Sequence, residues 1–259
     1  MRKLLVVSFG MIMVLTFIIS VRAQSSDQPK NEIEVRGTYS IPSGEANFSG
    51  TTASGSTIDF ARDFDFHNEF GFAVRYTYRS SNGKHKIGAD YDSTNWERNT
   101  TLSRTIVFEG VTYTANANLV GNLKLQTFRA MYSYRWGNDK VRIGPMVDMG
   151  VVKTSLNLTG TTNSGTRSAE GSISKFAATI GYDLDYTPSS KFNLFHNLGA
   201  IAFQGDHLFH TEGGVKVFVA RNLGVVGGYK AQRYRFEEDG PNFLTIRQHG
   251  PFFGGVFRF

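Results

Sequence analysis

Hydrophobic and polar side chains alternate along most of the chain after residue 30. Between residues 69 and 80, Phe, Val and Tyr fall on even positions, and Glu69, Arg75 and Arg79 fall on odd ones. Side chains two residues apart share one face of a β-strand, so the pattern predicts strands with one apolar and one polar face. In 192–203 the register is ambiguous, because apolar residues occupy both faces. The chain contains ten such segments: 31–41, 69–80, 86–92, 128–136, 141–151, 176–186, 192–203, 213–220, 225–236 and one that ends at Phe259.

Short and long connections alternate between these segments. Tight turns are predicted at 81–84, 137–139, 187–190 and 221–224, the first of them around an Asn-Gly pair that suits a type I′ turn. Long polar loops are predicted at 42–67, 93–118 and 159–171, with shorter ones at 204–211 and 237–241, and residues 105–114 could form an extramembrane ribbon. Both termini then lie on the side of the short turns. This layout predicts an all-β fold, a transmembrane antiparallel up-and-down β-barrel of ten strands, with eight strands as the alternative.

The C-terminal strand carries a row of aromatic side chains that runs to the last residue of the chain. Phe253, Phe257 and Phe259 share one face, which an amphipathic edge strand would also explain when taken alone. This strand resembles the C-terminal strand of bacterial outer-membrane β-barrels, in which a terminal Phe and alternating aromatics are the assembly signal. The resemblance covers the small outer-membrane β-barrel superfamily, of OmpA-type and porin-like barrels, and no specific subfamily. It implies contact with the barrel-assembly machinery through Phe253, Phe257 and Phe259.

The N-terminal residues have the pattern of a secretory signal peptide. Arg2 and Lys3 precede an apolar run at 4–20, and Ala23 offers a small residue at the cleavage site, so we expect a mature chain that begins at Gln24. A retained transmembrane anchor is the alternative, because the apolar run approaches the length of a membrane span. The predicted division is a cleaved signal peptide at 1–23, a short polar leader at 24–30 and an outer-membrane β-barrel at 31–259.

Composition narrows the classes of function. Cleavage after residue 23 would remove three cations and no acid, which lowers the formal net charge from +6 to +3. No Lys/Arg cluster of the kind that follows a phosphate backbone is present, so we expect no nucleic-acid partner. The chain contains no cysteine, which excludes disulfides, thiolate metal sites and a cysteine nucleophile. The six histidines have no ligand spacing, and we expect no cofactor and no metal.

Aromatic residues gather near the short-turn ends of the predicted strands, where one membrane interface would lie. Tyr and Trp are typical of such interfaces, since they combine an apolar ring with a polar group. Clustering by strand end favours a membrane barrel over a soluble β-sandwich. The predicted interface aromatics are Tyr76, Tyr78, Tyr132, Tyr134, Trp136, Tyr182 and Tyr186.

The polar faces of the strands predict a charged lumen. Both signs occur in nearly equal number, and in a narrow lumen we expect ion pairs, because an unpaired buried charge costs several kcal/mol. The network could fill and stiffen the barrel or form a constriction that selects small solutes. Ten strands lie nearer to a filled barrel than to an open channel, which favours the first. The predicted network is Glu34, Arg36, Glu69, Arg75, Arg79, Asp90, Asp92, Arg129, Arg135, Arg142, Asp148, Lys175, Asp183, Asp185, Lys216 and Lys230.

Two groups of residues resemble the sites of barrel enzymes. Asp90 and Asp92, with Asp206, His207 and His210, are similar to the paired Asp/Asp and Asp/His residues of the omptin proteases. The adjacency of Asp206 and His207 departs from that family's pattern, and Asp90 is too near a short turn to reach a rim.

The segment 195–200 is faintly similar to the His/Ser site of lipid A deacylases. It contains His196 but no serine at the matching position, so we predict no deacylase site and no catalytic residues.

We therefore expect a non-enzymatic integral outer-membrane protein, either structural or a narrow passive pore for small solutes. One alternative is a surface adhesin or recognition protein that acts through the long loops, and a second is an omptin-like hydrolase at the barrel rim. The expected partners are outer-membrane lipid and lipopolysaccharide, and the expected state is a monomer. The expected location is the bacterial outer membrane, with periplasmic termini and extracellular long loops.

Overall fold

The computed structural model describes residues 30–50, 53–162, 165–203, 205–237 and 242–259. The predicted signal peptide, its cleavage site and nearly all of the polar leader lie outside these residues. The described part is almost entirely β-structure. It contains no helix that is long and apolar enough to cross a membrane. The ten long strands are β1 (Asn31–Asn47), β3 (Glu69–Arg79), β4 (His85–Thr101), β7 (Asn118–Tyr134), β9 (Val141–Thr162), β10 (Gly165–Ser189), β11 (Phe192–Phe203), β12 (Asp206–Phe218), β13 (Leu223–Glu237) and β14 (Phe243–Arg258).

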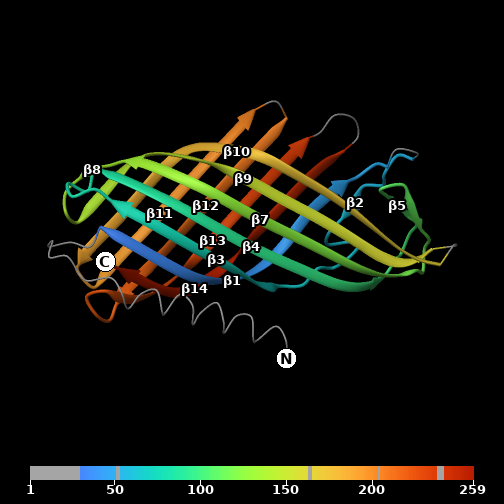
Figure 1. Ribbon diagram of the computed structural model, residues 1–259, viewed down its shortest axis with the longest axis horizontal. Coiled ribbons are helices and arrows are strands. Elements are labelled where there is room, and N and C mark those ends of the chain that lie inside the picture. Colours follow the sequence, from blue (N-terminus) through green and yellow to red (C-terminus); the bar gives the residue numbers. More distant parts are fainter. Residues whose placement is uncertain (1–29, 51–52, 163–164, 204, 238–241) are drawn as a thin grey trace.

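These ten strands close into a ring, which confirms the predicted fold class (Figure 1). Each strand pairs antiparallel with its neighbours in the chain, and β1 closes the ring by pairing with β14. The ends of the described chain meet there, where backbone hydrogen bonds of 3.0 and 2.9 Å join Asn31 and Phe259. Around the part of the barrel where all ten strands are paired, closure leaves no free edge, which removes the site at which an exposed sheet would aggregate.

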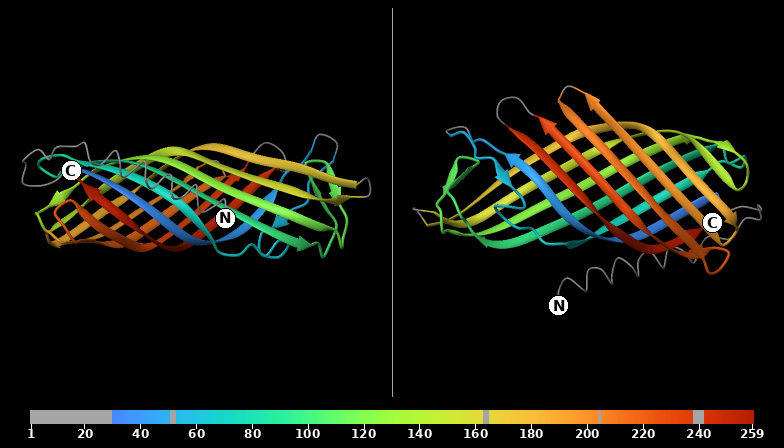
Figure 2. Two further views of the ribbon diagram at one scale, coloured as in Figure 1. Left: turned by 60° about the horizontal axis from the view of Figure 1, so that its bottom comes forward. Right: turned by 180° about the vertical axis from the view of Figure 1, so that it is seen from behind.

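Four strands are much longer than the alternation predicted. The first nine residues of the predicted loop 93–118 continue β4, most of the predicted loop 159–171 continues β9 and β10, and 42–47 continues β1. β7 begins at Asn118, ten residues before the predicted strand. The predicted loop 204–211 is likewise wrong from residue 206 on, because β12 begins there. Figures 1 and 2 show β4, β7, β9 and β10 extending past the ends of β11 to β14. We call the outer parts of these four strands, residues 93–101, 118–126, 153–162 and 165–174, the wall.

Large hydrophobic side chains face outward on the part of every strand nearest the short turns. Phe70, Phe176 and Phe253, for example, are each about three-fifths exposed or more. A closed barrel with such an outward apolar face fits a lipid environment, so this part of the barrel spans a membrane. The apolar belt consists of Tyr39, Ile41, Phe70, Phe72, Tyr76, Ile87, Tyr91, Phe128, Tyr132, Trp136, Val141, Ile143, Val147, Met149, Val151, Phe176, Ile180, Tyr186, Phe192, Leu194, Phe209, Leu223, Val225, Tyr229 and Phe253.

Beyond the belt, the apolar residues change to the opposite face of the strand. In β9, Val151 points outward and is 43% exposed, whereas the next residue, Val152, is buried inside the barrel together with Leu156 and Leu158. β4, β7, β10, β13 and β14 change in the same way. Outside the membrane, water replaces lipid around the barrel, so apolar side chains are more stable inside it. The inward residues of this part are Trp96, Leu119, Leu123, Leu125, Val152, Leu156, Leu158, Ile173, Tyr234, Phe236, Leu244 and Ile246.

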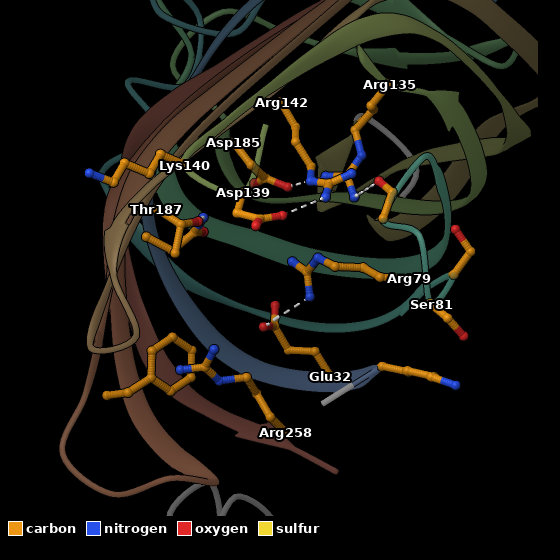
Figure 3. Close-up of a pocket in the computed structure, with 15 residues that line it drawn as sticks. Glu32, Arg79, Ser81, Arg135, Asp139, Lys140, Arg142, Asp185, Thr187 and Arg258 are labelled. Carbon is orange, nitrogen blue, oxygen red and sulfur yellow. Dashed lines mark hydrogen bonds and ion pairs between the residues drawn. The ribbon is translucent and has the colours of Figure 1, made fainter. Parts of the chain in front are cut away.

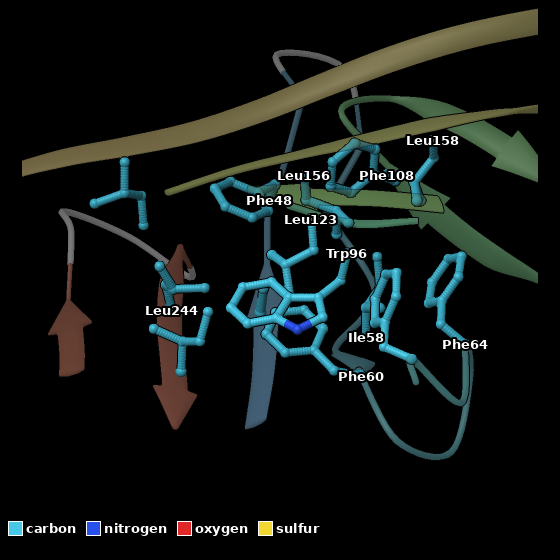
Figure 4. Packing of buried hydrophobic residues seen from close by; sticks show 14 of the residues in the cluster. Phe48, Ile58, Phe60, Phe64, Trp96, Phe108, Leu123, Leu156, Leu158 and Leu244 are labelled. Atoms are coloured by element: carbon cyan, nitrogen blue, oxygen red, sulfur yellow. The ribbon is translucent and has the colours of Figure 1, made fainter. Parts of the chain in front are cut away.

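Two connecting segments fold into this part of the barrel and complete an apolar cluster (Figure 4). Residues 48–50 and 53–66, which include β2 (Ile58–Asp59), supply Phe48, Phe60 and Phe64 among others. The hairpin of β5 (Ile106–Phe108) and β6 (Val111–Tyr113), which confirms the predicted ribbon, supplies further residues to the cluster. A fourth short strand, β8 (Trp136–Gly137), lies at the short-turn end.

Two buried polar groups of the apolar cluster have hydrogen-bond partners, whereas the hydroxyl of Tyr234 has none among the described residues. The indole N–H of Trp96 donates to the carbonyl of Ser40 at 3.1 Å, and the hydroxyl of Tyr113 donates to the carbonyl of Leu158 at 2.9 Å. These bonds remove the penalty that an unpaired polar group would carry in an apolar interior.

The carboxylate of Asp63, 5% exposed, holds the segment 48–66 through its charge. It accepts two hydrogen bonds from the Arg104 guanidinium, at 2.7 and 3.2 Å, and others from Arg62. Burial alone raises the pKa of Asp63, but the bonds from Arg104 and Arg62 outweigh it and lower the pKa to about 2.

Candidate functional site

The lumen of the membrane-spanning part contains a chain of buried ion pairs. The carboxylate of Glu212 accepts hydrogen bonds from Arg36 at 2.7 Å and from Arg75 at 2.7 and 2.9 Å. Arg75 also bonds Asp90 at 2.9 Å, and Arg129 bonds the same carboxylate at 3.0 Å. These side chains come from β1, β3, β4, β7 and β12, so the chain of pairs crosses the lumen from one side to the other. Such pairing satisfies charges that would be very costly alone in a narrow interior.

A second group of ion pairs lies nearer to the short turns. Lys86 donates to Asp183 at 2.6 Å, and Arg135 forms ion pairs with Asp183 and Asp185. On the other side of the lumen, Lys216 pairs with Glu32 and with Glu34. Nearly every one of these side chains is less than 10% exposed.

Two smaller contacts complete the charged lumen. Lys230 pairs with Asp92. Asp148 lies 2.5 Å from Nε2 of His210 and accepts a hydrogen bond from the hydroxyl of Thr179 at 2.8 Å. Both Asp148 and Thr179 approach the same nitrogen of His210, so this group lacks the relay geometry of a nucleophile, base and orienting acid.

A cavity of about 390 Å³ lies at the short-turn end of the barrel (Figure 3). The pairs Arg79–Glu32 and Arg135–Asp185 line it and also belong to the charged lumen, so the network forms part of its wall. Six cationic and three acidic side chains line the cavity, which gives it a positive formal charge. They are Lys30, Arg79, Arg135, Lys140, Arg142, Arg258, Glu32, Asp139 and Asp185.

Known structures share this architecture. The outer membrane protease OmpT of Escherichia coli matches with a TM-score of 0.59 over 92% of this chain and 99% of that chain, at 10% identity. The chain has the fold of bacterial outer-membrane β-barrels. The toluene transporter TbuX of Ralstonia pickettii also matches, with a TM-score of 0.39, 14% identity, and 90% and 75% of the two chains. So does Ail of Yersinia pestis, with a TM-score of 0.35, 13% identity, and 88% and 99% of the two chains. No family model and no curated protein matches the sequence.

Most of the charges predicted for the lumen of this outer-membrane barrel lie in it. Three of the sixteen lie elsewhere. Glu69 is exposed at the first residue of β3, and Lys175 donates to the carbonyl of Glu237 at 3.4 Å on the long-loop side, beyond the belt. Arg142 lies at the rim of the short-turn cavity, where it bonds Asp139 and the carbonyl of Asn82. Each follows the alternation but sits at an end of the membrane-spanning part, where water can solvate its charge.

Sequence reasoning missed several members of the network. Glu212, which joins Arg36 to Arg75, was placed at the edge of a predicted loop, although it keeps the alternation of β12 with Lys216. Lys86 and Glu32 lie within the predicted strands 86–92 and 31–41, on the same faces as Asp90 and Glu34, but were not included in the predicted network. Extending the predicted strand 213–220 by one residue would have included Glu212.

The predicted interface aromatics face outward near the short turns. Tyr76, Tyr132, Trp136 and Tyr186 are between 39% and 55% exposed, and Tyr78, Tyr134 and Tyr182 are half-buried. In the last strand Phe253 and Phe257 share the outward face, and Phe259 follows the end of β14.

The residues that resemble an omptin site do not come together. Asp90 and Asp92 of β4 pair with cations inside the lumen. His207 is exposed on the outward face of β12. Asp206 accepts a hydrogen bond from the backbone N–H of Glu237 at the long-loop end.

The His196 ring is held by the hydroxyls of Tyr182 and Thr211, which accounts for its polar groups. Among the described residues no group of His, Asp and Glu side chains could hold a metal ion.

Proposed function

We propose that the protein is a non-enzymatic integral protein of the bacterial outer membrane with a closed lumen and a structural role. One observation carries this proposal: ion pairs cross the membrane-spanning lumen, and the apolar cluster fills the barrel beyond it. A solute would have to displace both. Of the two hypotheses that the sequence leaves open, a structural role and a narrow passive pore, the pore is therefore the weaker.

The proposed orientation places the two termini and the short turns in the periplasm. Outer-membrane barrels have short periplasmic turns and longer extracellular connections, so the wall and the apolar cluster would project outside the cell. The C-terminal strand, with Phe253, Phe257 and Phe259, would engage the assembly machinery. Closure of the ten strands into a ring, with β1 paired to β14, supports a monomer.

Surface recognition is the second candidate, favoured by the side chains of the wall. Strand register places Asn122 beside Asn157, and Asn157 beside Glu170, in a row of outward amide and carboxylate groups. The apolar cluster supports the strands behind this row, so the row is held rigid. Replacing Asn122 and Asn157 by Ala should abolish adhesion of the folded protein to cells or matrix if this candidate is right, and leave it unchanged if the role is structural.

Planar-bilayer recording of the folded mature protein tests the closed lumen. We expect no discrete conductance steps from protein whose folding is verified by its circular dichroism. Steps that change in size when Arg75 or Asp148 is replaced by Ala would contradict the proposal and establish a pore.

Hydrolase activity is tested separately with peptide substrates. Turnover that is lost on Asp206→Ala or His207→Ala would contradict the non-enzymatic part of the proposal, and we expect no turnover from the unmodified protein.

A further inference from the structure

Two arginines face each other on the outer surface, just beyond the apolar belt. Arg233 of β13 and Arg247 of β14 are directly opposite in the strand register, and both are exposed. Directly opposite residues of antiparallel strands have Cα atoms about 4.5–5.5 Å apart, so both guanidinium groups can reach one point. Like charges in this position destabilise a sheet.

No acidic group of the described residues neutralises this arginine pair. Neither guanidinium has an ion pair or a hydrogen bond with a described side chain, although Arg235, the next outward residue, pairs with Glu237 at 2.7 Å. The other carboxylate near in register, Glu45, lies on β1 diagonal to Arg247 and forms no ion pair with it. Within the described part of the chain, the arginine pair therefore presents two positive charges without an acidic partner to whatever lies outside the barrel.

The position of the arginine pair along the strands identifies its surroundings. Leu223 and Arg233 both face outward on β13, ten residues apart. At a rise of about 3.4 Å per residue and a tilt of about 40°, this corresponds to about 26 Å along the membrane normal, close to the apolar band of about 25 Å of such barrels. The pair thus lies at the level of the lipid headgroups.

Apolar side chains of the belt lie beside the arginine pair and on its belt side. Phe209 is directly opposite Arg233 on β12. Tyr229, 51% exposed, lies four residues from Arg233 on the belt side of β13, and its hydroxyl lies 2.6 Å from Nδ1 of His249. Acyl chains would contact Phe209 and Tyr229 while the headgroup contacts the arginines. A free anion in water would gain nothing from these apolar side chains.

We propose that Arg233 and Arg247 form a binding site for the phosphate group of an outer-leaflet lipid, an inference that rests on the proposed outer-membrane location and orientation. Arginine binds phosphate oxygens with two parallel N–H donors, and two arginines that approach one phosphate provide enough positive charge to neutralise it. Bound phosphate also turns the repulsion between the two side chains into a shared contact.

The binding test uses native mass spectrometry of the full mature protein in a maltoside detergent, with lipid A that carries two phosphates. We expect retained lipid on the unmodified protein and at least about tenfold less on the Arg233→Ala/Arg247→Ala double variant, because charge-assisted hydrogen bonds are lost. Arg235→Ala is the matched control, since its charge is already paired, and should bind as the unmodified protein does. Equal binding by the double variant would overturn the proposal.

A stability measurement separates this site from a merely exposed pair of charges. In maltoside without lipid, Arg247→Gln should raise the melting temperature, because it removes a like-charge contact, and with lipid A present it should lower it relative to the unmodified protein. The absence of this reversal would overturn the proposal. Stabilisation by inorganic phosphate equal to that by lipid A would also overturn it, because the site would then take a free anion.

Discussion

The two halves of this barrel have opposite interiors. In the membrane-spanning half, the lumen contains ion pairs such as Arg75–Glu212 and the outside is apolar. In the half that includes the wall, the interior contains residues such as Trp96 and Leu123, and the outside is polar. The difference shows that the surrounding solvent, lipid or water, decides which face of the same strand is apolar.

The largest expected effect of a single substitution is in the apolar half. Trp96→Ala removes the largest buried side chain and the hydrogen bond to Ser40, so we expect a loss of about 4 kcal/mol in the free energy of unfolding. Trp136→Ala, at a residue that is 55% exposed, should cost about 1 kcal/mol. Urea unfolding in lipid vesicles measures both, and equal losses would contradict a packed interior in this half.

A slightly smaller effect on the free energy of unfolding is expected in the membrane-spanning half, where the lumen contains ion pairs. Glu212→Ala leaves Arg36 and Arg75 without their shared acceptor in a buried site, which should cost about 3 kcal/mol. Glu237→Ala removes an exposed ion pair with Arg235 and should cost less than about 1 kcal/mol. If the two losses are the same in urea unfolding, the lumen is wet and screened, contrary to the structure.

The stability of the half with the apolar interior should also depend on pH, through the carboxylate of Asp63. Its pKa is lowered from 3.8 to about 2 in the folded protein, so its contribution is complete above about pH 4 and is lost as the pH falls to about 2. The loss is about 2 kcal/mol, and Asp63→Asn should remove it at neutral pH. Trp96 fluorescence in a Trp136→Phe background reports the change.

Asp65, 75% exposed on the same segment, provides the control for the acid response. Asp65→Asn should leave the acid transition where it is in the unmodified protein. A shift equal to that of Asp63→Asn would mean that general charge, and not the buried bonds to Arg104, holds the segment.

The barrel could be predicted from the sequence because lipid imposes a simple rule on the belt. Every second residue is apolar from Val141 to Val151, and the short turns interrupt the pattern at clear positions. The lengths of β4, β7, β9 and β10 could not be found in this way. After Val151 the apolar residues move to even positions, beginning with Val152. A search for apolar residues at every second position, starting from Val141, therefore ends at Val151 although the strand continues.

Contacts between distant segments explain the rest of what the sequence did not show. Nothing local indicates that Phe60 and Phe64 pack into the barrel, because the residues of β7 and β9 in the same cluster are distant from them in the chain. Glu212 joins Arg36 and Arg75 from strands far apart in the chain. In six strands the apolar residues change from one face of the strand to the other. This shared change is a signal in the sequence that would have indicated the apolar interior beyond the belt.

The most direct test of the two interiors uses the two tryptophans, one in each half. Trp136→Phe and Trp96→Phe leave a single reporter in each variant, which is reconstituted in vesicles and exposed to brominated acyl chains and to iodide. Trp136 should be quenched by the brominated lipid and Trp96 by neither reagent. Quenching of Trp96 by brominated lipid would place the apolar cluster in the membrane, and quenching by iodide would show an interior open to water; either result would contradict the account.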